Sequence, residues 1–268
     1  MNARPVLATI ILGVTLPPAC VSSQSLAARI AAAPGDVRFA FTSRPDVIGN
    51  GYSIIRWSCD GGRCRQQIDG DYSDADDNDW RSPCDTGPVR VTLRRRDGRV
   101  VGVRTAVGSR VSAFGTGTDL GRVSAPEAVR YLLDLAARAE GDLGGKAIFA
   151  ATLADSATTW PELLRLARDR DVPAQTRRSA VFWVSQAAEA AATRGLDELI
   201  GEDTADREVR EAAVFALSQR PREEGVPVLI RIAAAHRDPA VRKRAIFWLG
   251  QSDDPRALAL FEQLLTRP

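Results

Sequence analysis

The sequence predicts a mainly α-helical protein, in which an α-solenoid follows a small antiparallel β domain. Three observations carry this prediction. Strand-like alternation and turn signals are confined to residues 36–122. From Ser124 onward the apolar residues recur at helical spacing, and no strand pattern returns. A short Ala-(Val/Ile)-Phe motif then recurs at an almost constant interval, which is typical of stacked helical repeats.

The first 23 residues have the features of an export signal. Arg4 supplies a positive charge, and residues 6–16 form an apolar stretch that is too short to cross a bilayer. Prolines end this stretch and small residues follow, so we expect cleavage between Ala19 and Gln24. The alternative is an apolar N-terminal helix of the folded protein. We expect an exported protein, either periplasmic or secreted, without a membrane span.

The cysteines bear on anchoring and on disulfide formation. Cys20 raises the alternative of a lipid anchor, but the preceding leucine lies one place too far upstream for that modification. An exported chain meets oxidising conditions, so we expect one disulfide among Cys59, Cys64 and Cys84. Cys59 with Cys64 would close a short loop, and Cys84 with either would close a longer one. The single histidine, His236, is too distant in the sequence to complete a zinc site with them.

The N-terminal half is expected to hold a spacer and then the β domain. Residues 24–35 are rich in alanine and end in Pro-Gly, which predicts a spacer. Residues 37–41 alternate as a strand does. Two further alternating segments, residues 89–94 and 100–105, flank an Asp-Gly turn and predict a hairpin. We therefore expect a small β domain, with a disulfide, over residues 36–122.

An acidic loop in this β domain offers a weak candidate metal site. Asp74, Asp76 and Asn78 alternate, and Asp85 stands at the twelfth place, as in a calcium-binding loop. Glycine is missing at the sixth place, so a solvated acidic loop is the simpler interpretation. Ligand or calcium binding by the β domain is the alternative function.

Residues 124–268 are built from a repeat. The motif alanines Ala147, Ala180, Ala213 and Ala245 are 33, 33 and 32 residues apart. A period of this size predicts helix pairs that stack into a solenoid, here about four pairs and a terminal half-repeat. The second helix of each pair, called the B helix below, carries the motif.

Each B helix has a phenylalanine off the stripe that faces its own partner helix. A helix with two apolar faces needs two neighbours, so we expect these side chains to pack against the B helix of the adjoining repeat. The expected repeat core comprises Phe149, Phe182, Phe215, Phe247, Trp183 and Trp248.

The last repeat reads Asp238-Pro239-Ala240-Val241-Arg242, followed by Ala245 and Leu249-Gly250, and residues 206–217 share much of this pattern. It closely resembles the HEAT-repeat family, especially the short bacterial repeats related to phycobilisome-lyase-type units. The resemblance covers residues 124–268 and implies an interaction scaffold.

Arginines recur at one position of the B helices, at Arg177, Arg210 and Arg242. We expect them to form a structural ladder, each bonding carbonyls or an aspartate of a neighbouring repeat. A basic strip for an acidic partner is the alternative.

Enzymatic relatives of this repeat class leave no signature here. Deoxyhypusine hydroxylase resembles these repeats but binds two irons with His-Glu pairs, and the only histidine here, His236, is followed by Arg237. Bilin lyases resemble them too, and a lyase relative stays an alternative, although no residue marks a bilin site. The sequence suggests no catalytic triad or phosphate loop either. We expect no enzymatic activity and no cofactor.

The partner is expected to be a protein. The chain has 36 basic and 34 acidic residues and a formal net charge of +2, which argues against a nucleic-acid binder. Polar residues beside the phenylalanines recur on the B helices and are the candidate contacts. They are Arg178, Gln186, Glu211, Gln219, Lys243 and Gln251.

Overall fold

The computed structural model describes residues 24–49, 53–60, 63–70, 86–108 and 117–266 of the 268-residue chain, with side chains left out at 53–60 and 63–70. Several predictions concern residues outside this set. These are the export signal with Cys20, the acidic loop with Asp74, Asp76, Asn78 and Asp85, and Cys84.

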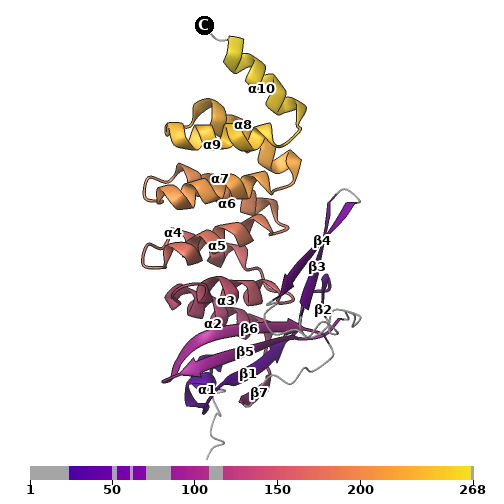
Figure 1. Ribbon diagram of the computed structural model, residues 1–268, viewed down its shortest axis with the longest axis vertical. Coiled ribbons are helices and arrows are strands. Elements are labelled where there is room, and N and C mark those ends of the chain that lie inside the picture. Colours follow the sequence, from indigo (N-terminus) through magenta and orange to yellow (C-terminus); the bar gives the residue numbers. More distant parts are fainter. Residues whose placement is uncertain (1–23, 50–52, 61–62, 71–85, 109–116, 267–268) are drawn as a thin grey trace, which may run out of the picture.

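The C-terminal part is a stack of four helix pairs followed by a single helix, as predicted (Figure 1). The pairs follow one another in chain order along one axis, and each B helix contacts the next. The pairs are α2 Ala125–Arg138 with α3 Leu143–Thr152, α4 Trp160–Arg168 with α5 Ala174–Ser185, α6 Ala190–Gly201 with α7 Arg207–Ser218, and α8 Arg222–Ala235 with α9 Pro239–Gly250, before α10 Pro255–Thr266.

Small residues and caps set this packing. The motif alanines of α3, α5, α7 and α9 are all fully buried, because alanine lets the helices of a pair approach closely. The hydroxyl of Ser124 accepts a hydrogen bond from the backbone N–H of Glu127 at the start of α2. Asp238 caps α9 in the same way, accepting from the backbone N–H of Ala240 at 2.8 Å.

A buried arginine joins the second, third and fourth pairs. The side chain of Arg220, just after α7, is only 2% exposed. It donates hydrogen bonds to the Thr193 hydroxyl at 2.8 Å and to the Glu224 carboxylate at 2.7 Å. Its remaining N–H groups donate to backbone carbonyls at the end of α5 and just after it, those of Ser185, Ala187 and Glu189. The guanidinium thereby holds the loop between α5 and α6 in place.

Among its described residues, the N-terminal part has seven strands in two sheets. One sheet has the order β6-β5-β1-β7 and the other the order β2-β3-β4. The strands are β1 Val37–Phe41, β2 Val47–Gly49, β3 Ser53–Asp60, β4 Arg63–Gly70, β5 Val89–Arg96, β6 Arg99–Val107 and β7 Thr118–Arg122.

The predicted hairpin is present, but the larger sheet is mixed. Strands β5 and β6 pair antiparallel around Asp97 and Gly98, which both have positive φ, as the tight hairpin turn requires. The expectation of a purely antiparallel domain is wrong, because β7 pairs parallel with β1. β5 occupies one edge of β1, and β7 takes the other edge immediately before the chain enters α2.

Residues 24–35 are not a spacer, because they contain helix α1, Leu26–Ala32. Leu26 and Ile30 of this helix are buried. The backbone N–H of Leu26 donates to the Glu127 carboxylate at 2.7 Å, which attaches the start of α1 to α2. Arg95 of β5 donates to the carbonyl of Ala33 at 2.6 Å and so holds the other end. Two buried apolar residues and these hydrogen bonds together dock the helix.

The sheet covers the first helix pair, at the opposite end of the stack from α10 (Figure 1). Phe39 of β1 contacts Tyr131 of α2 edge-on, with ring centroids 6.3 Å apart. Two backbone hydrogen bonds of 2.9 Å, from Arg44 to Leu153 and from Asp155 to Thr42, join the segment after β1 to the segment after α3. The buried apolar residues form one continuous cluster across both parts. The β part therefore closes the open end of the solenoid.

Candidate functional site

The aromatic residues of the B helices pack between repeats. Phe149 lies against Trp183 of the next repeat with ring centroids 5.6 Å apart, and Phe215 lies against Trp248 at 4.8 Å. At the position of these tryptophans, α7 has Ala216, and Phe182 instead contacts Trp183 of its own helix at 5.2 Å. The expected packing of a motif phenylalanine against the next B helix is therefore present at two interfaces, that of α3 with α5 and that of α7 with α9.

The predicted repeat core is wrong at Phe247. Its side chain was expected to be buried like the other motif phenylalanines, but 52% of it is exposed. It contacts Trp248 of its own helix at a centroid distance of 5.0 Å. The reason is that no helix of the described chain covers this side of α9.

The recurring arginines have structural partners. Arg177 forms an ion pair of 2.6 Å with Asp206 of the next repeat, and its side chain is 9% exposed. Arg210 lies 3.7 Å from Asp238, again one repeat further on. Arg242 donates to the backbone carbonyl of His236 at 2.6 Å. The contacts of Arg177 and Arg210 match the expected ladder, whereas Arg242 bonds within its own helix pair. Arg177 is too buried to meet a partner.

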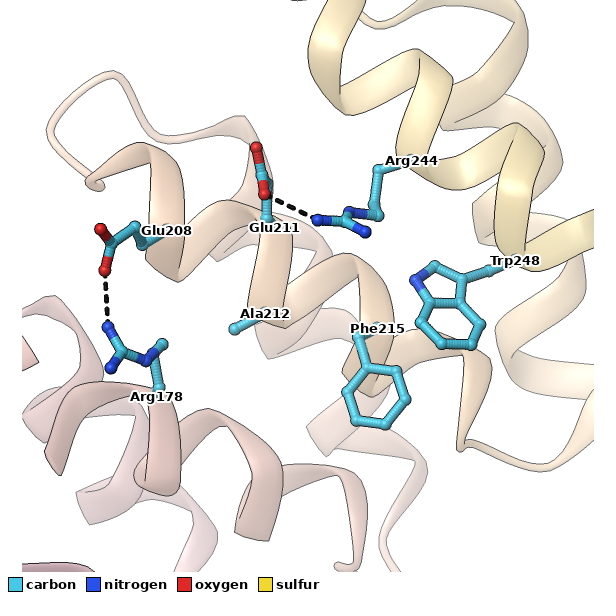
Figure 2. A pocket seen from close by; sticks show the side chains of 7 residues that line it. All are labelled: Arg178, Glu208, Glu211, Ala212, Phe215, Arg244 and Trp248. Carbon is cyan, nitrogen blue, oxygen red and sulfur yellow. Dashed lines mark hydrogen bonds and ion pairs between the residues drawn. The ribbon is translucent and has the colours of Figure 1, made fainter. Parts of the chain in front are cut away.

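An open groove crosses three B helices, α5, α7 and α9 (Figure 2), and has a volume of ≈ 410 Å³. Its floor is apolar, with the side chains of Ala212, Phe215 and Trp248. Its rims are ion pairs that bridge neighbouring repeats. They are Arg178–Glu208 at 2.5 Å and Arg244–Glu211 at 2.9 Å.

Glu211 organises one rim of the groove. It accepts a hydrogen bond from Arg207 of its own helix at 2.8 Å and one from Arg244 of the next repeat. These two hydrogen bonds lower the pKa of the Glu211 carboxyl, because they stabilise its charged form. The rim therefore stays ionised at neutral pH and holds Arg244 beside Trp248.

Trp248 carries an unused hydrogen-bond donor. Its indole Nε1–H is buried and has no partner. Figure 2 shows this nitrogen on the side of the ring that faces Arg244. A buried donor without an acceptor costs about 1–3 kcal/mol.

The groove includes two of the six predicted contact residues, Arg178 and Glu211. The other four do not line it. Lys243 is exposed on α9, and Gln186, Gln219 and Gln251 cap the C-terminal ends of α5, α7 and α9. Sequence reasoning missed Ala212 and Arg244, which occupy equivalent positions in successive repeats and share no residue type.

A second hollow, of ≈ 460 Å³, lies on the opposite helices, α6 and α8. Ion pairs cross it between Arg231 and Asp197 and, nearby, between Arg237 and Asp203. His236, which borders it, accepts a hydrogen bond at Nδ1 from the backbone N–H of Asp238 at 3.1 Å. His236 thus serves the local turn between α8 and α9, and the hollow lacks the aromatic floor of the groove.

Stacked helix pairs with an arginine ladder define the class as an α-solenoid. Within it, residues 196–268 match the family of HEAT repeats, as the sequence predicts, and the helix pairs before them stack in the same way. Neither the curated proteins nor the solved structures gave a match. HEAT repeats often mediate protein interactions, so the fold is a repeat scaffold suited to that role.

Two further findings apply to the described residues only. None of their helices combines the length and the hydrophobicity that crossing a membrane requires. They also hold no group of three or more His, Cys, Asp or Glu side chains placed to bind a metal ion. The predicted calcium ligands lie outside them.

Proposed function

We propose that this protein is an exported, non-enzymatic scaffold that binds a protein partner in the groove across α5, α7 and α9. The observation that carries the proposal is the aromatic floor of Phe215 and Trp248 between rims of fixed charge. Protein interfaces concentrate binding energy in such aromatic and arginine clusters, bordered by polar groups.

The groove suits an extended segment of a partner. An apolar side chain of that segment would rest on Phe215 and Trp248, in the space above the small Ala212. Arg178 and Glu208 are 44% and 69% exposed at their side chains, so charged groups of either sign on the segment would find a partner at the rim.

The test fills the groove without removing a packed residue. Ala212→Arg places a long side chain on the floor, and α9 carries an arginine, Arg244, at the equivalent position. Ala234→Arg is the matched control, because Ala234 is exposed on α8, outside the groove. Peptides are selected on the wild-type protein from a displayed library, and their affinities are measured by fluorescence anisotropy.

The expected result is that selected peptides bind Ala234→Arg as they bind wild type and bind Ala212→Arg at least about tenfold more weakly, or about 1.4 kcal/mol. Peptides that bind all three proteins equally would place the binding surface elsewhere. If no peptide is enriched on the wild-type protein, the scaffold proposal fails for this groove.

The export part of the proposal rests on residues 1–23 and gains support from the cysteines. In the β3–β4 pair, Cys59 stands directly opposite Cys64. Opposed residues of antiparallel strands have Cα atoms about 4.5–5.5 Å apart, within the range that a disulfide spans. We therefore favour a Cys59–Cys64 disulfide, with Cys84 left as a thiol.

Mass spectrometry of protein recovered from the periplasm or medium tests both points. The mature N-terminus is expected between residues 19 and 24, and a non-reducing digest should contain one peptide pair that joins Cys59 to Cys64. A full-length N-terminus would contradict export, and a cross-link that includes Cys84 would contradict the pairing.

A further inference from the structure

The C-terminal end of the solenoid is apolar and uncovered. Five large hydrophobic side chains are exposed in the described residues, and four of them lie here: Ile246 at 36%, Phe247 at 52%, Leu258 at 62% and Leu265 at 86%. Large apolar side chains that are exposed together at one end of a protein point to an interaction site. The fifth, Val101, lies in the sheet at the other end of the molecule.

The end face consists of one stripe on each of the last two helices. On α9 it comprises the exposed residues Lys243, Ile246, Phe247 and Gly250, which share one side by their spacing of three and four. On α10 it comprises the exposed residues Leu258, Glu262 and Leu265, spaced in the same way.

Earlier repeats show what a covered B helix looks like. Phe149 and Phe215 each lie beneath a tryptophan of the following B helix. The α9 helix has no such neighbour in the described chain. The helix α10 packs more extensively on α8 than on α9, and Figure 1 shows it at the tip of the stack, inclined to the other helices. The side of α9 that bears Phe247 is therefore the vacant position for one more helix.

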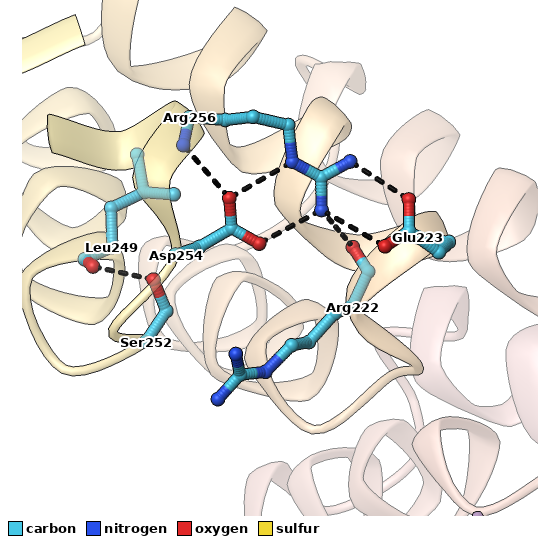
Figure 3. Close-up of polar contacts among 6 residues, drawn as sticks. All are labelled: Arg222, Glu223, Leu249, Ser252, Asp254 and Arg256. Carbon is cyan, nitrogen blue, oxygen red and sulfur yellow. Dashed lines mark hydrogen bonds and ion pairs between the residues drawn. The ribbon is translucent and has the colours of Figure 1, made fainter. Parts of the chain in front are cut away.

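The start of α10 is held rigidly. Arg256 donates to the Asp254 carboxylate at 2.9 and 2.8 Å and to Glu223 of α8 at 2.9 Å (Figure 3). The backbone carbonyl of Arg222 accepts from the same guanidinium at 3.3 Å. This network fixes the first turn of α10 to α8, so its outer stripe is presented in a set orientation.

We propose that two copies of this protein associate through their end faces, with α10 of each copy covering α9 of the other. The contact is isologous, because each copy supplies both a vacant helix position and an unpaired apolar stripe. Leu258 would pack on Phe247 of the second copy, which brings Glu262, one turn further along α10, level with Lys243. Gly250 has no atom near the position of a Cβ, so a helix can approach closely there.

Charge supports a second copy as the occupant. Lys243 lies one turn before Phe247 on α9, and Glu262 lies between the two leucines on α10. In the two-fold arrangement Lys243 of each copy faces Glu262 of the other, so both ends of the contact gain an opposite charge. A face that carries both charges at matching positions fits another copy.

The experiment measures the mass of the full chain in solution by sedimentation velocity at increasing concentrations, up to about 100 µM. The wild-type protein is expected to be a dimer. Replacing Leu258 and Leu265 together by glutamate should give a monomer, whereas Val101→Glu, which alters the exposed hydrophobic residue at the other end, should leave the dimer intact. Circular dichroism confirms that each variant is folded.

A charge exchange makes the test specific to this arrangement. Lys243→Glu and Glu262→Lys should each raise the dimer dissociation constant by about tenfold or more, because each creates two like-charge contacts. The double variant should restore the wild-type constant. A wild-type protein that stays monomeric overturns the proposal, and so does a double variant as weak as the single ones.

Discussion

Replacing Arg220 with alanine should be among the most damaging single changes to this fold. The guanidinium is 2% exposed and serves five acceptors from the segment after α5, from α6 and from α8. Removing one partner of a buried charged pair costs about 3–5 kcal/mol. The side chain of Glu224 is 26% exposed and can turn to water, so we expect the lower end, about 3 kcal/mol. This is a large part of the ~5–15 kcal/mol by which domains are stable.

Urea unfolding followed by far-ultraviolet circular dichroism measures this loss. Arg220→Lys keeps the charge but not the planar fork, so it should lose about 1–2 kcal/mol. Arg165→Ala is the matched surface control, because Arg165 is 55% exposed at its side chain and pairs with Glu162 on α4. It should cost at most about 1 kcal/mol. If Arg220→Ala costs no more than Arg165→Ala, the buried arginine does not hold the repeats together and our reasoning is refuted.

Three further predictions concern other contacts. Gly225→Ala should destabilise the protein by about 1–3 kcal/mol in urea, because its Cβ would lie closer than 3.0 Å to the backbone oxygen of Leu217. Gly195→Ala should cost less, since its Cβ would meet only a movable methyl group of Leu164, and equal losses would contradict this comparison. Hydrogen bonds from Arg256 lower the pKa of Asp254 to about 2, so the stability it contributes is complete above about pH 4 and is lost as the pH falls toward 2. The melting temperature of Asp254→Asn should therefore fall less over that interval than that of the wild type, and parallel curves would refute this role. Leu26→Asp should detach α1 and raise amide hydrogen exchange in α2, where unchanged exchange would show that α1 adds nothing.

The repeat was predictable because its signal is local and recurs. The four motif alanines mark positions where helices touch, and a fixed period follows directly from stacking similar units. The same pattern misled at Phe247, since periodicity identifies an apolar face but does not reveal whether a neighbour covers it. In the terminal repeat the pattern is intact and the neighbour is missing from the described chain.

The features that the sequence did not reveal depend on contacts between segments that are distant in the sequence. The strand β7 reads Thr-Asp-Leu-Gly-Arg, which lacks alternation, and it forms only because the edge of β1 is free. The acceptors of Arg220 lie up to 35 residues away in the sequence. At the position equivalent to Arg220, the neighbouring repeats have Ala187 and Ser252, so the repeat pattern does not reveal these hydrogen bonds. The groove was predictable only in part. Arg178 and Glu211 occupy equivalent positions in successive repeats, whereas Arg244 lines the groove because it forms an ion pair with Glu211 of the preceding repeat.

The long-range ties of the N-terminal part impose an order on folding as the chain emerges. Leu26 needs Glu127, 101 residues later, and the backbone of Arg44 needs Leu153. The four strands of the larger sheet precede α2 and can pair without it, but the side of the sheet that faces the core stays uncovered until the first helix pair has appeared. Each later repeat needs only the one before it. Vulnerability to proteases and to aggregation is thus concentrated at the beginning of synthesis, and it ends when α3 docks.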